Sequence, residues 1–364
     1  MRLSATLFWY FARQIGIGVA VAFFALSFLI FLVDVVELSR RGAGEADVRF
    51  AIILKMALLH LPYLTQQVIP YAVMLGTMLA LARLNRASEL VIARSSGISN
   101  LQMLIPGVLV ALAIGVVTVT AFNPFASALL SRYEQIDSRY LRGEVSNLAV
   151  SSSGLWLRQA DDFGESVIHA KRITPTEIKL HEVIIFRFEG QDKFVERIDA
   201  ETADLHEGYW QLSEALITGP DRIAERRETY RFDTELTVDR IQESFASPET
   251  LSFWQMPAFV ALLERAGFSS LKHRVHWHKV LASPLLLAGM VLIGATFSLR
   301  MTRRGGTGLL VGVGVAAGFV LYVFSDVILA LGLSAKIPAE ISAWAPAMVA
   351  VLIGSGLLLY VRDA

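Results

Sequence analysis

Arginine, histidine and carboxylate side chains are the groups in this sequence that could do chemistry, because the chain contains no cysteine. Without cysteine there is no disulfide, no thiolate nucleophile and no cysteine-ligated metal. The sequence also lacks G-x-x-x-x-G-K-[ST], H-E-x-x-H, G-x-S-x-G and G-x-G-x-x-G, the motifs of ATP binding, zinc proteolysis, acyl transfer and dinucleotide binding. We therefore expect no catalytic residue and no cofactor, so that the chain is not itself an enzyme.

Seven cations could bind anionic groups, because each lies near the end of an apolar segment. Arginine matches a phosphate with two parallel hydrogen bonds, and such contacts strengthen next to a layer of low dielectric. The alternative for each cation is that its stem lies along the apolar layer while its charge reaches ordinary lipid headgroups. The seven are Arg40, Arg41, Arg49, Arg132, Arg139, Arg274 and Lys279.

A histidine cluster, His273, His276 and His278, precedes the fourth apolar segment. Positions 273 and 276 would share a helix face, which is a spacing that a transition-metal site could use. The basic and aromatic neighbours Arg274 and Trp277 favour instead a segment at the membrane–water interface. We predict no metal site.

Membrane-spanning helices must position these groups. Of the 364 residues, 54% are hydrophobic and 18% charged, and the mean hydropathy is +0.52. A helix that crosses the ~30 Å hydrocarbon core needs about 20 mostly apolar residues. Six segments meet this requirement: 15–33, 56–82, 101–122, 280–299, 308–331 and 341–360. The net charge is zero, which gives no reason to expect nucleic acid as a partner.

The charged residues are concentrated between the third and fourth spans, in a water-exposed insert. From about 145 to 250 the sequence alternates between apolar and polar residues with a period of two, interrupted by turn signals. Roughly six to eight short strands without helices between them predict an all-β sandwich or jelly-roll-like domain. Helical connectors are expected at 125–145 and 255–278. The candidate core of the insert is Val167, Ile184, Phe186, Trp210 and Leu212.

The predicted domains are a first transmembrane half, 1–131, the insert, 132–279, and a second transmembrane half, 280–364. With the N-terminus inside, the inner segments carry more Lys and Arg than the short outer loops. This orientation puts both termini in the cytoplasm and the insert on the far side of the membrane. Arg40 and Arg41 then violate the rule, as an outer anion site would require.

A short helix is expected on the inner side between the second and third spans, at about 85–96. Asn85 could cap its start, and Gly97 could end it in the left-handed conformation. Glu89 falls in its first turn, and the neighbouring Leu90 and Val91 face water unless a partner covers them. We expect this helix to dock in a groove of a cytoplasmic protein, or else to lie as an amphipathic helix on the membrane surface.

The chain resembles the LptF/LptG family of lipopolysaccharide export permeases over essentially its whole length. The resemblance rests on Ala87-Ser88-Glu89-Leu90 followed by Ser96-Gly97, on Gly154-Leu155-Trp156 at the start of the β-region, and on three spans either side of it. Three further features are more similar to the LptG branch than to the LptF branch. They are Val33-Asp34, the run from Gly318 to Tyr322 with Asp326, and Ile337-Pro338.

The resemblance implies a permease subunit of an ABC transporter that extracts lipopolysaccharide from the inner membrane. A separate cytoplasmic ATPase, a dimer of LptB, would power it, and a second, LptF-type permease would complete the membrane part. The lipid would pass to a periplasmic β-jelly-roll bridge that begins with LptC. Glu89 would contact the ATPase, with Arg86, Ser88 and Leu90 as its neighbours, and the seven outer cations would bind the lipopolysaccharide.

The implied fold is a membrane protein of six transmembrane helices, three plus three, with an inserted periplasmic all-β jelly-roll-like domain. Two other classes stay open. One is an envelope scaffold that is merely anchored in the membrane. The other is an ion-coupled transporter, which needs intramembrane carboxylates in paired repeats, whereas Asp326 in the fifth span is nearly alone.

Overall fold

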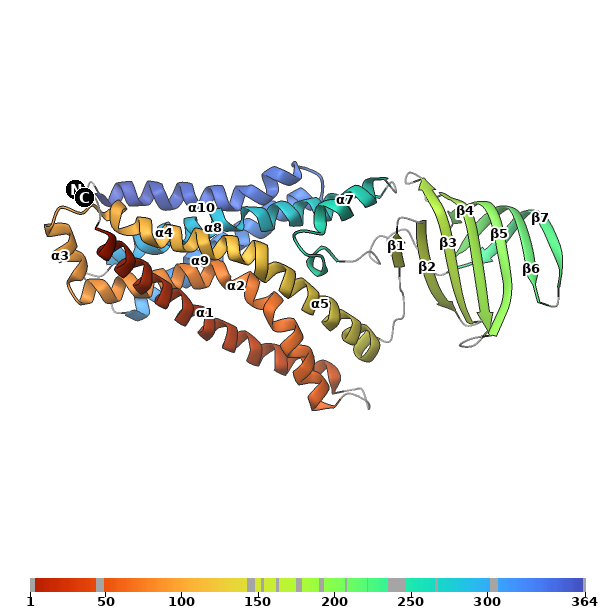
Figure 1. Ribbon diagram of the computed structural model, residues 1–364, viewed down its shortest axis with the longest axis horizontal. Coiled ribbons are helices and arrows are strands. Elements are labelled where there is room, and N and C mark those ends of the chain that lie inside the picture. Colours follow the sequence, from red (N-terminus) through yellow and green to blue (C-terminus); the bar gives the residue numbers. More distant parts are fainter. Residues whose placement is uncertain are drawn as a thin grey trace. The chain divides into compact units, whose positions relative to one another are not determined.

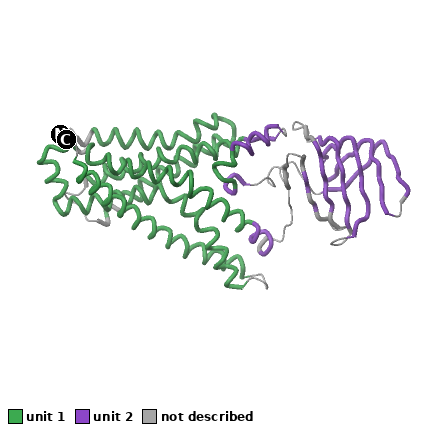
Figure 2. Tube along the Cα trace, in the orientation of Figure 1, with its two compact units in different colours: residues 1–134, 251–256, 271–364 green, residues 135–250, 257–270 purple. Residues whose placement is uncertain are grey.

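The computed structural model describes residues 4–43, 49–142, 148–151, 154–161, 164–174, 179–189, 193–206, 208–220, 222–234, 247–265, 268–301 and 307–362. The chain divides into two compact units (Figure 2). Unit 1 comprises Met1–Glu134, Leu251–Met256 and Leu271–Ala364, and unit 2 comprises Gln135–Thr250 and Pro257–Ser270. Each unit is described by itself.

Unit 1 is a bundle of long helices (Figure 1). Six helical segments are long and apolar enough to cross a membrane, which confirms the six predicted spans. The third is continuous through two π-helical turns. In chain order its helices are α1 (Ala5–Gly42), α2 (Phe50–Arg86), α3 (Glu89–Ser95), α4 (Asn100–Val117), η1 (Thr118–Phe122), α5 (Asn123–Asp137), α8 (Leu271–Met301), α9 (Thr307–Leu333) and α10 (Ala339–Arg362). The π-helical turn η2 (Ser138–Arg142) follows α5 directly and belongs to unit 2.

Small residues let the helices of unit 1 pack closely. A Cβ added to Gly18 of α1 would lie 2.5 Å from the carbonyl oxygen of Gly76 in α2, so the two backbones touch. The same holds between α4 and α8, where a Cβ on Gly115 would lie 2.4 Å from the Cα of Pro284. Such contacts replace the hydrophobic effect as the force that joins helices in lipid.

Burial within unit 1 is uneven. The most apolar stretches of α2 and α8 are each 61% buried, whereas that of α1 is 11% and that of α9 is 17% buried. Helices α2 and α8 therefore form the centre of the bundle, and α1 and α9 lie on its outside with apolar faces that this chain does not cover.

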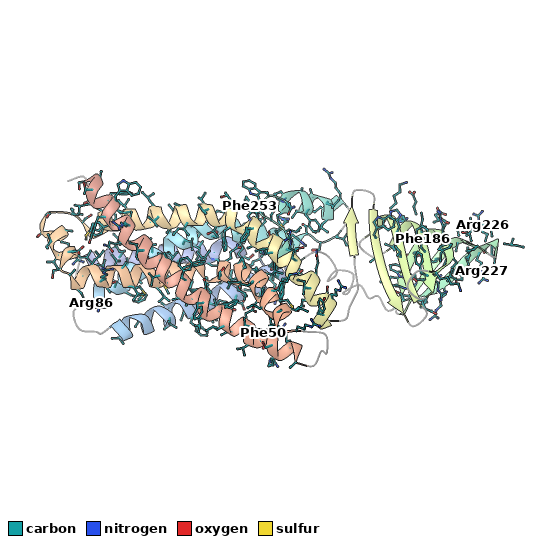
Figure 3. All side chains as sticks on the ribbon, turned by 60° about the horizontal axis from the view of Figure 1, so that its bottom comes forward. Phe50, Arg86, Phe186, Arg226, Arg227 and Phe253 are labelled. Atoms are coloured by element: carbon teal, nitrogen blue, oxygen red, sulfur yellow. The ribbon has the colours of Figure 1, made fainter. Side chains whose placement is uncertain are left out.

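The π-helical turn η1 anchors the segment that returns from unit 2. A π-turn displaces backbone hydrogen bonds, and here the Thr120 carbonyl accepts a hydrogen bond from the Trp254 indole Nε1 over 3.1 Å. Next to it, Asn123 Oδ1 accepts from the backbone N–H of Phe253 over 2.8 Å. Figure 3 labels Phe253 at this junction. The return segment is thus fastened to the third span.

Unit 2 contains an antiparallel sheet with strand order β1 to β7 as in the sequence, which confirms the predicted all-β insert (Figure 1). A hairpin turns at Gly208, with His206 opposite Tyr209 and a positive φ of 82° at the glycine. The strands are β1 (Leu148–Ser151), β2 (Gly154–Asp161), β3 (Gly164–Thr174), β4 (Lys179–Glu189), β5 (Lys193–His206), β6 (Tyr209–Gly219) and β7 (Arg222–Asp233). A short 3-10 turn, η3 (Pro248–Thr250), and helix α7 (Met256–Arg265) follow.

Trp210 and Leu212 are fully buried, as predicted, but Val167, Ile184 and Phe186 lie half-buried on the opposite face of the sheet, so their assignment to the core was wrong. The buried positions along each strand skip a residue. In β5 they run through Ile198 and Ala200 to Ala203, and in β6 they run through Leu212 to Ala215. The strict period of two fails at these skips.

Residues at the positions where the alternation breaks have unusual backbone conformations. Glu182 in β4 and Glu214 in β6 have positive φ angles of 54° and 53°, a conformation that L-residues seldom adopt. Each is salt-bridged to a cation at 2.8 Å, Glu182 to Lys171 and Glu214 to Arg226. The strands bend along the row of residues that contains these two glutamates. Beyond the bend, each side chain points to the face of the sheet opposite to the one that simple alternation predicts.

The inward face of the sheet is filled by its own side chains. Trp210, Leu212 and Ile198 are 0% exposed, and the apolar cluster around them includes Leu263 of α7. Gln159 of β2 bridges to the end of β7, because its Oε1 accepts from the Thr234 hydroxyl over 2.5 Å. The hydrogen bond therefore links β2 to the residue that follows β7, the last strand.

Candidate functional site

The short inner helix is present as α3, seven residues from Glu89 to Ser95. The predicted cap at Asn85 was wrong, because α2 continues through Arg86 and Asn85 belongs to its last turn. The chain turns at Ser88, whose φ of 60° is left-handed and whose side chain makes no capping bond. Gly97 has the predicted left-handed conformation, with a φ of 81°.

Leu90 is 1% exposed, which corrects the prediction that it faces water. With Ala93 it inserts into an apolar cluster formed by the adjacent ends of the other helices, among them Phe11, Leu84 and Leu104. Residues 90 and 93 share a helix face, and that face is turned inward. The apolar side chains that α3 leaves exposed are Val91 (56%) and Ile92 (63%).

Glu89 begins α3 and is held by a residue from the start of the chain. The Tyr10 hydroxyl of α1 donates a hydrogen bond of 2.6 Å to Glu89 Oε2. Arg86 and Ser88 are exposed beside it, and Figure 3 labels Arg86 where α2 meets α3. The structure thus brings Arg86, Ser88 and Glu89 to one surface, together with Val91 and Ile92. No local pattern pointed to Tyr10, which lies 79 residues before Glu89.

Among the predicted outer cations, two share one carboxylate. Arg40 donates to Glu37 from Nε and Nη2, each over 2.9 Å, and Arg41 Nε donates to Glu37 Oε1 over 2.8 Å. Arg40 holds this carboxylate with the two-pronged geometry that it would offer a phosphate. Glu37, Arg40 and Arg41 all lie on the last turns of α1, so they form one cluster with a net charge of about +1.

The remaining cations are dispersed. Arg274 at the start of α8 donates to Glu340 of α10 over 2.6 Å, and the Arg139 guanidinium lies 5.7 Å from the ring centroid of Tyr140. Arg49, Arg132 and Lys279 are exposed. Arg139 belongs to unit 2 and the other cations to unit 1, where Arg40 and Arg41 share Glu37.

A polar pair that sequence reasoning missed joins α1 to α2. His60 Nδ1 lies 3.0 Å from Asp34 Oδ1, and the two side chains are only 17% and 12% exposed. The imidazole stacks on Tyr133 of α5 at 4.3 Å between ring centroids and 7° between planes. The signal was available, because Asp34 and His60 lie at similar distances from the connection between two antiparallel helices.

The histidines before the fourth span do not form a metal centre in the part of the chain that is described, where no group of three or more His, Asp or Glu side chains could hold a metal ion. His273 is buried. His278 Nδ1 accepts a hydrogen bond of 3.4 Å from the Trp344 indole, and its Nε2 lies 3.8 Å from Glu340. This cluster fastens α8 to α10.

A cavity of about 590 Å³ lies on the outward face of the sheet in unit 2, along the row where the strands bend. Its charges largely compensate one another. Lys171 pairs with Glu182 and Arg226 with Glu214. Arg197 donates two hydrogen bonds to the lining residue Asp199, which raise the pKa of the Arg197 guanidinium. These pairs compensate three of the lining carboxylates, and Glu201 adds a fourth.

Comparison with known proteins decides the family. The family described as "Lipopolysaccharide export system permease LptF/LptG" matches residues 9–360. The chain belongs to the LptF/LptG family. It is 27% identical over 350 residues to the "Lipopolysaccharide export system permease protein LptG" of Escherichia coli K12, covering 92% of each chain. It is 24% identical over 361 residues to the protein of the same name from Haemophilus influenzae Rd, covering 96% of this chain and 98% of that one.

Within the LptF/LptG family the chain is LptG-like, as the sequence predicted. Six helices able to span a membrane, together with membership of this permease family, indicate a multi-pass protein of the inner membrane. The family is a permease component of the lipopolysaccharide export system, which suggests that the chain has no catalytic activity of its own.

Proposed function

We propose that this chain is the LptG-type permease subunit of an ABC exporter that lifts lipopolysaccharide out of the inner membrane. A dimer of the LptB ATPase supplies the energy, an LptF-type permease is the second membrane subunit, and the lipid leaves towards a periplasmic β-jelly-roll bridge through LptC. Residues 1–131 and 280–364 form the transmembrane halves, and 132–279 form the periplasmic domain. Both termini are cytoplasmic.

The observation that carries this proposal is the surface of α3. Leu90 and Ala93 anchor the helix in the apolar cluster of the bundle, while Glu89, Val91 and Ile92 stand outside it. A rigidly held short helix with two exposed apolar side chains beside a carboxylate is suited to a groove with an apolar floor and a cationic rim. Arg86 and Ser88 border this surface. Leu90 acts from beneath, as the anchor of the helix.

The poor burial of α1 and α9 supports a second permease. Side chains such as Phe24, Phe28 and Phe319 are 70%, 64% and 65% exposed. Lipid or a partner helix must cover them, because apolar faces of this size do not stay in water. We assign these two helices to the contact with the LptF-type subunit and to the opening through which the lipid enters.

Lipopolysaccharide combines acyl chains with phosphates, so a carrier needs an apolar wall below and cations above. The exposed face of α1 supplies the wall, and Arg40 and Arg41 supply cations at its outer end. Arg49, Arg132, Arg139, Arg274 and Lys279 are assigned to the same role more peripherally. Burying each CH₂ of an acyl chain is worth ~0.8 kcal/mol, so removal of several chains from the bilayer requires the external energy of the ATPase.

Charge reversal at Glu89 tests the proposal. In the complex purified from native membranes in mild detergent, Glu89→Lys is expected to reduce the recovery of the ATPase and to abolish lipid release, while the chain stays folded and inserted. Glu225→Lys, on the exposed part of β7 in unit 2, is the matched control and should behave as wild type. If ATPase recovery and lipid release are unchanged in Glu89→Lys, the assignment of α3 is refuted. If the wild-type chain is recovered without any ATPase, a scaffold or an ion-coupled transporter is favoured.

A further inference from the structure

A hydrogen bond connects the first turns of α1 to the first residue of α3. The Tyr10 hydroxyl donates to Glu89 Oε2 over 2.6 Å, and a phenol that donates to a carboxylate makes a stronger bond than a neutral pair. Tyr10 is 37% exposed, so its hydroxyl reaches the same surface as Glu89. With Oε2 held, the Glu89 carboxylate has a fixed orientation, and Oε1 is left for a donor from a partner protein.

The apolar packing around this bond makes the connection stiff. Phe11, the neighbour of Tyr10, is 2% exposed and lies in the same apolar cluster as Leu90 and Ala93 of α3. The start of α1 and the helix α3 therefore share both a core contact and a polar contact. A displacement of α3 must move the first turns of α1 or break both contacts.

From Tyr10 α1 runs without a break to Gly42, a rod of about 50 Å at 1.5 Å per residue. At Gly18 its backbone touches Gly76 of α2. Further out the side of the rod that does not face α2 is thinly covered, with Val21, Phe28 and Val33 each about 60% exposed. The side that faces α2 is held by the Asp34–His60 pair, so the outer part of α1 moves together with the adjoining part of α2.

The far end of the same rod carries Glu37, Arg40 and Arg41. One continuous helix therefore links the surface assigned to the ATPase with the cations assigned to the lipid. We propose that Tyr10 is a positioning residue that fixes Glu89 and couples it to α1, so that α1 acts as a lever that carries displacement of α3 to Arg40 and Arg41. This inference rests on the proposed function, because it takes the partner of Glu89 to be the ATPase.

The absence of cysteine from the sequence makes the lever directly measurable. Spin labels at Val36→Cys, on the outer part of α1, and Ile341→Cys, at the start of α10, occupy positions that are 69% and 59% exposed. Their separation is measured by pulsed electron paramagnetic resonance in the full complex, in nanodiscs that contain lipopolysaccharide, with and without ATP. ATP is expected to shift the distance distribution, and Tyr10→Phe, which deletes only the hydroxyl, is expected to abolish most of that shift.

The same samples give a second readout, the lipid released per ATP hydrolysed. Tyr10→Phe should lower this ratio by about tenfold, the factor that corresponds to loss of one hydrogen bond to a charged group. Glu89→Gln should lower it similarly, and the double variant should lose little more, because the two side chains act as one joint. Ser355→Ala in α10 deletes a hydroxyl that donates to carbonyls of its own helix; it is the control and should match wild type.

Three outcomes overturn the lever. They are an ATP-dependent shift in Tyr10→Phe equal to that of wild type, additive losses in the double variant, and a wild-type chain whose labels do not move with ATP. Glu89→Lys separates this inference from the proposed function. If Glu89→Lys uncouples transport while Tyr10→Phe does not, only the lever fails. If Glu89→Lys also transports normally, the assignment of α3 itself is wrong.

Discussion

Leu90 and Ile92 lie two residues apart in α3 but face opposite ways, and exchanging each for alanine should separate anchoring from recognition. Leu90 is 1% exposed within a core cluster, whereas Ile92 is 63% exposed. Leu90→Ala is expected to destabilise the chain by about 2–5 kcal/mol, the range for truncating a fully buried leucine. Ile92→Ala should change the stability of the chain by less than about 0.5 kcal/mol, as at other exposed sites.

The two variants should rank the other way round in their effect on the affinity for the ATPase, which Ile92→Ala should weaken directly. If the ATPase covers Ile92, the truncation removes three buried carbons at ~0.8 kcal/mol each, or up to about 2 kcal/mol. That amounts to roughly a thirtyfold loss of affinity. Leu90→Ala should weaken binding only through loss of the helix itself, so its binding defect should grow with temperature as α3 detaches.

Two measurements check these expectations in the full complex and in the permease freed of its ATPase. Thermal denaturation gives the stability of each variant, and titration with ATPase gives the affinity. In addition, Leu90→Cys should resist maleimide labelling under all conditions, whereas Ile92→Cys should label readily until ATPase is added. Rapid labelling of Leu90→Cys in a folded chain, or equal destabilisation by Leu90→Ala and Ile92→Ala, would refute the orientation of α3.

Three further predictions concern the outer end of α1 and its packing. Replacing both Arg40 and Arg41 with alanine should reduce crosslinking to lipopolysaccharide without changing basal ATP hydrolysis. Glu37→Gln frees the two guanidinium groups from their shared carboxylate and should increase crosslinking severalfold. Equal crosslinking in the wild type and both variants would mean that these arginines contact only ordinary lipid headgroups. Asp34→Ala should lower the stability of the chain by about 1–3 kcal/mol, because it leaves the nearly buried His60 without its partner. Proteolysis or labelling of the outer part of α1 should then become faster. An unchanged melting temperature would contradict a structural role for the pair. Gly76→Val should prevent α1 from packing against α2, since a Cβ there would lie 2.4 Å from the Cα of Val19. The yield of folded protein should fall sharply. Gly356→Val, at a site with open space, is the control and should be tolerated.

Hydrophobic length predicted the six spans because it is a property of contiguous sequence. The predicted segment 15–33 nevertheless covers only half of α1, which continues to Gly42 through Asp34 and Glu37. A hydropathy window ends at the first charges, while the helix ends where its backbone hydrogen bonds do. The charged turns beyond the window, with Glu37, Arg40 and Arg41, are the part of α1 that carries a candidate site.

The residues that sequence reasoning misplaced depend on contacts made far along the chain. A seven-residue helix has only two turns, so local pattern could not decide whether Leu90 or Ile92 faces the bundle, and the neighbours that bury Leu90 range from Phe11 to Leu358. In the insert, alternation predicted the strands but not the bends at Glu182 and Glu214, so the inward face was misassigned for Ile184 and Phe186. Positive φ at a glutamate leaves no mark in the sequence.

The distribution of polar groups within the described part of the bundle favours the proposed externally powered permease over an ion-coupled transporter. A proton or ion path needs titratable groups in sequence across the membrane. Among the described residues, several buried hydroxyls of the bundle bond to backbone carbonyls, as Thr77 does to Val73 over 2.7 Å and Ser298 to Met78 over 3.2 Å. Asp34 and His60 pair near the outer ends of α1 and α2, and Asp326 is exposed on α9. These described groups fasten or flank helices, an arrangement that supports the proposal that the energy for moving a lipid enters at α3 from another chain.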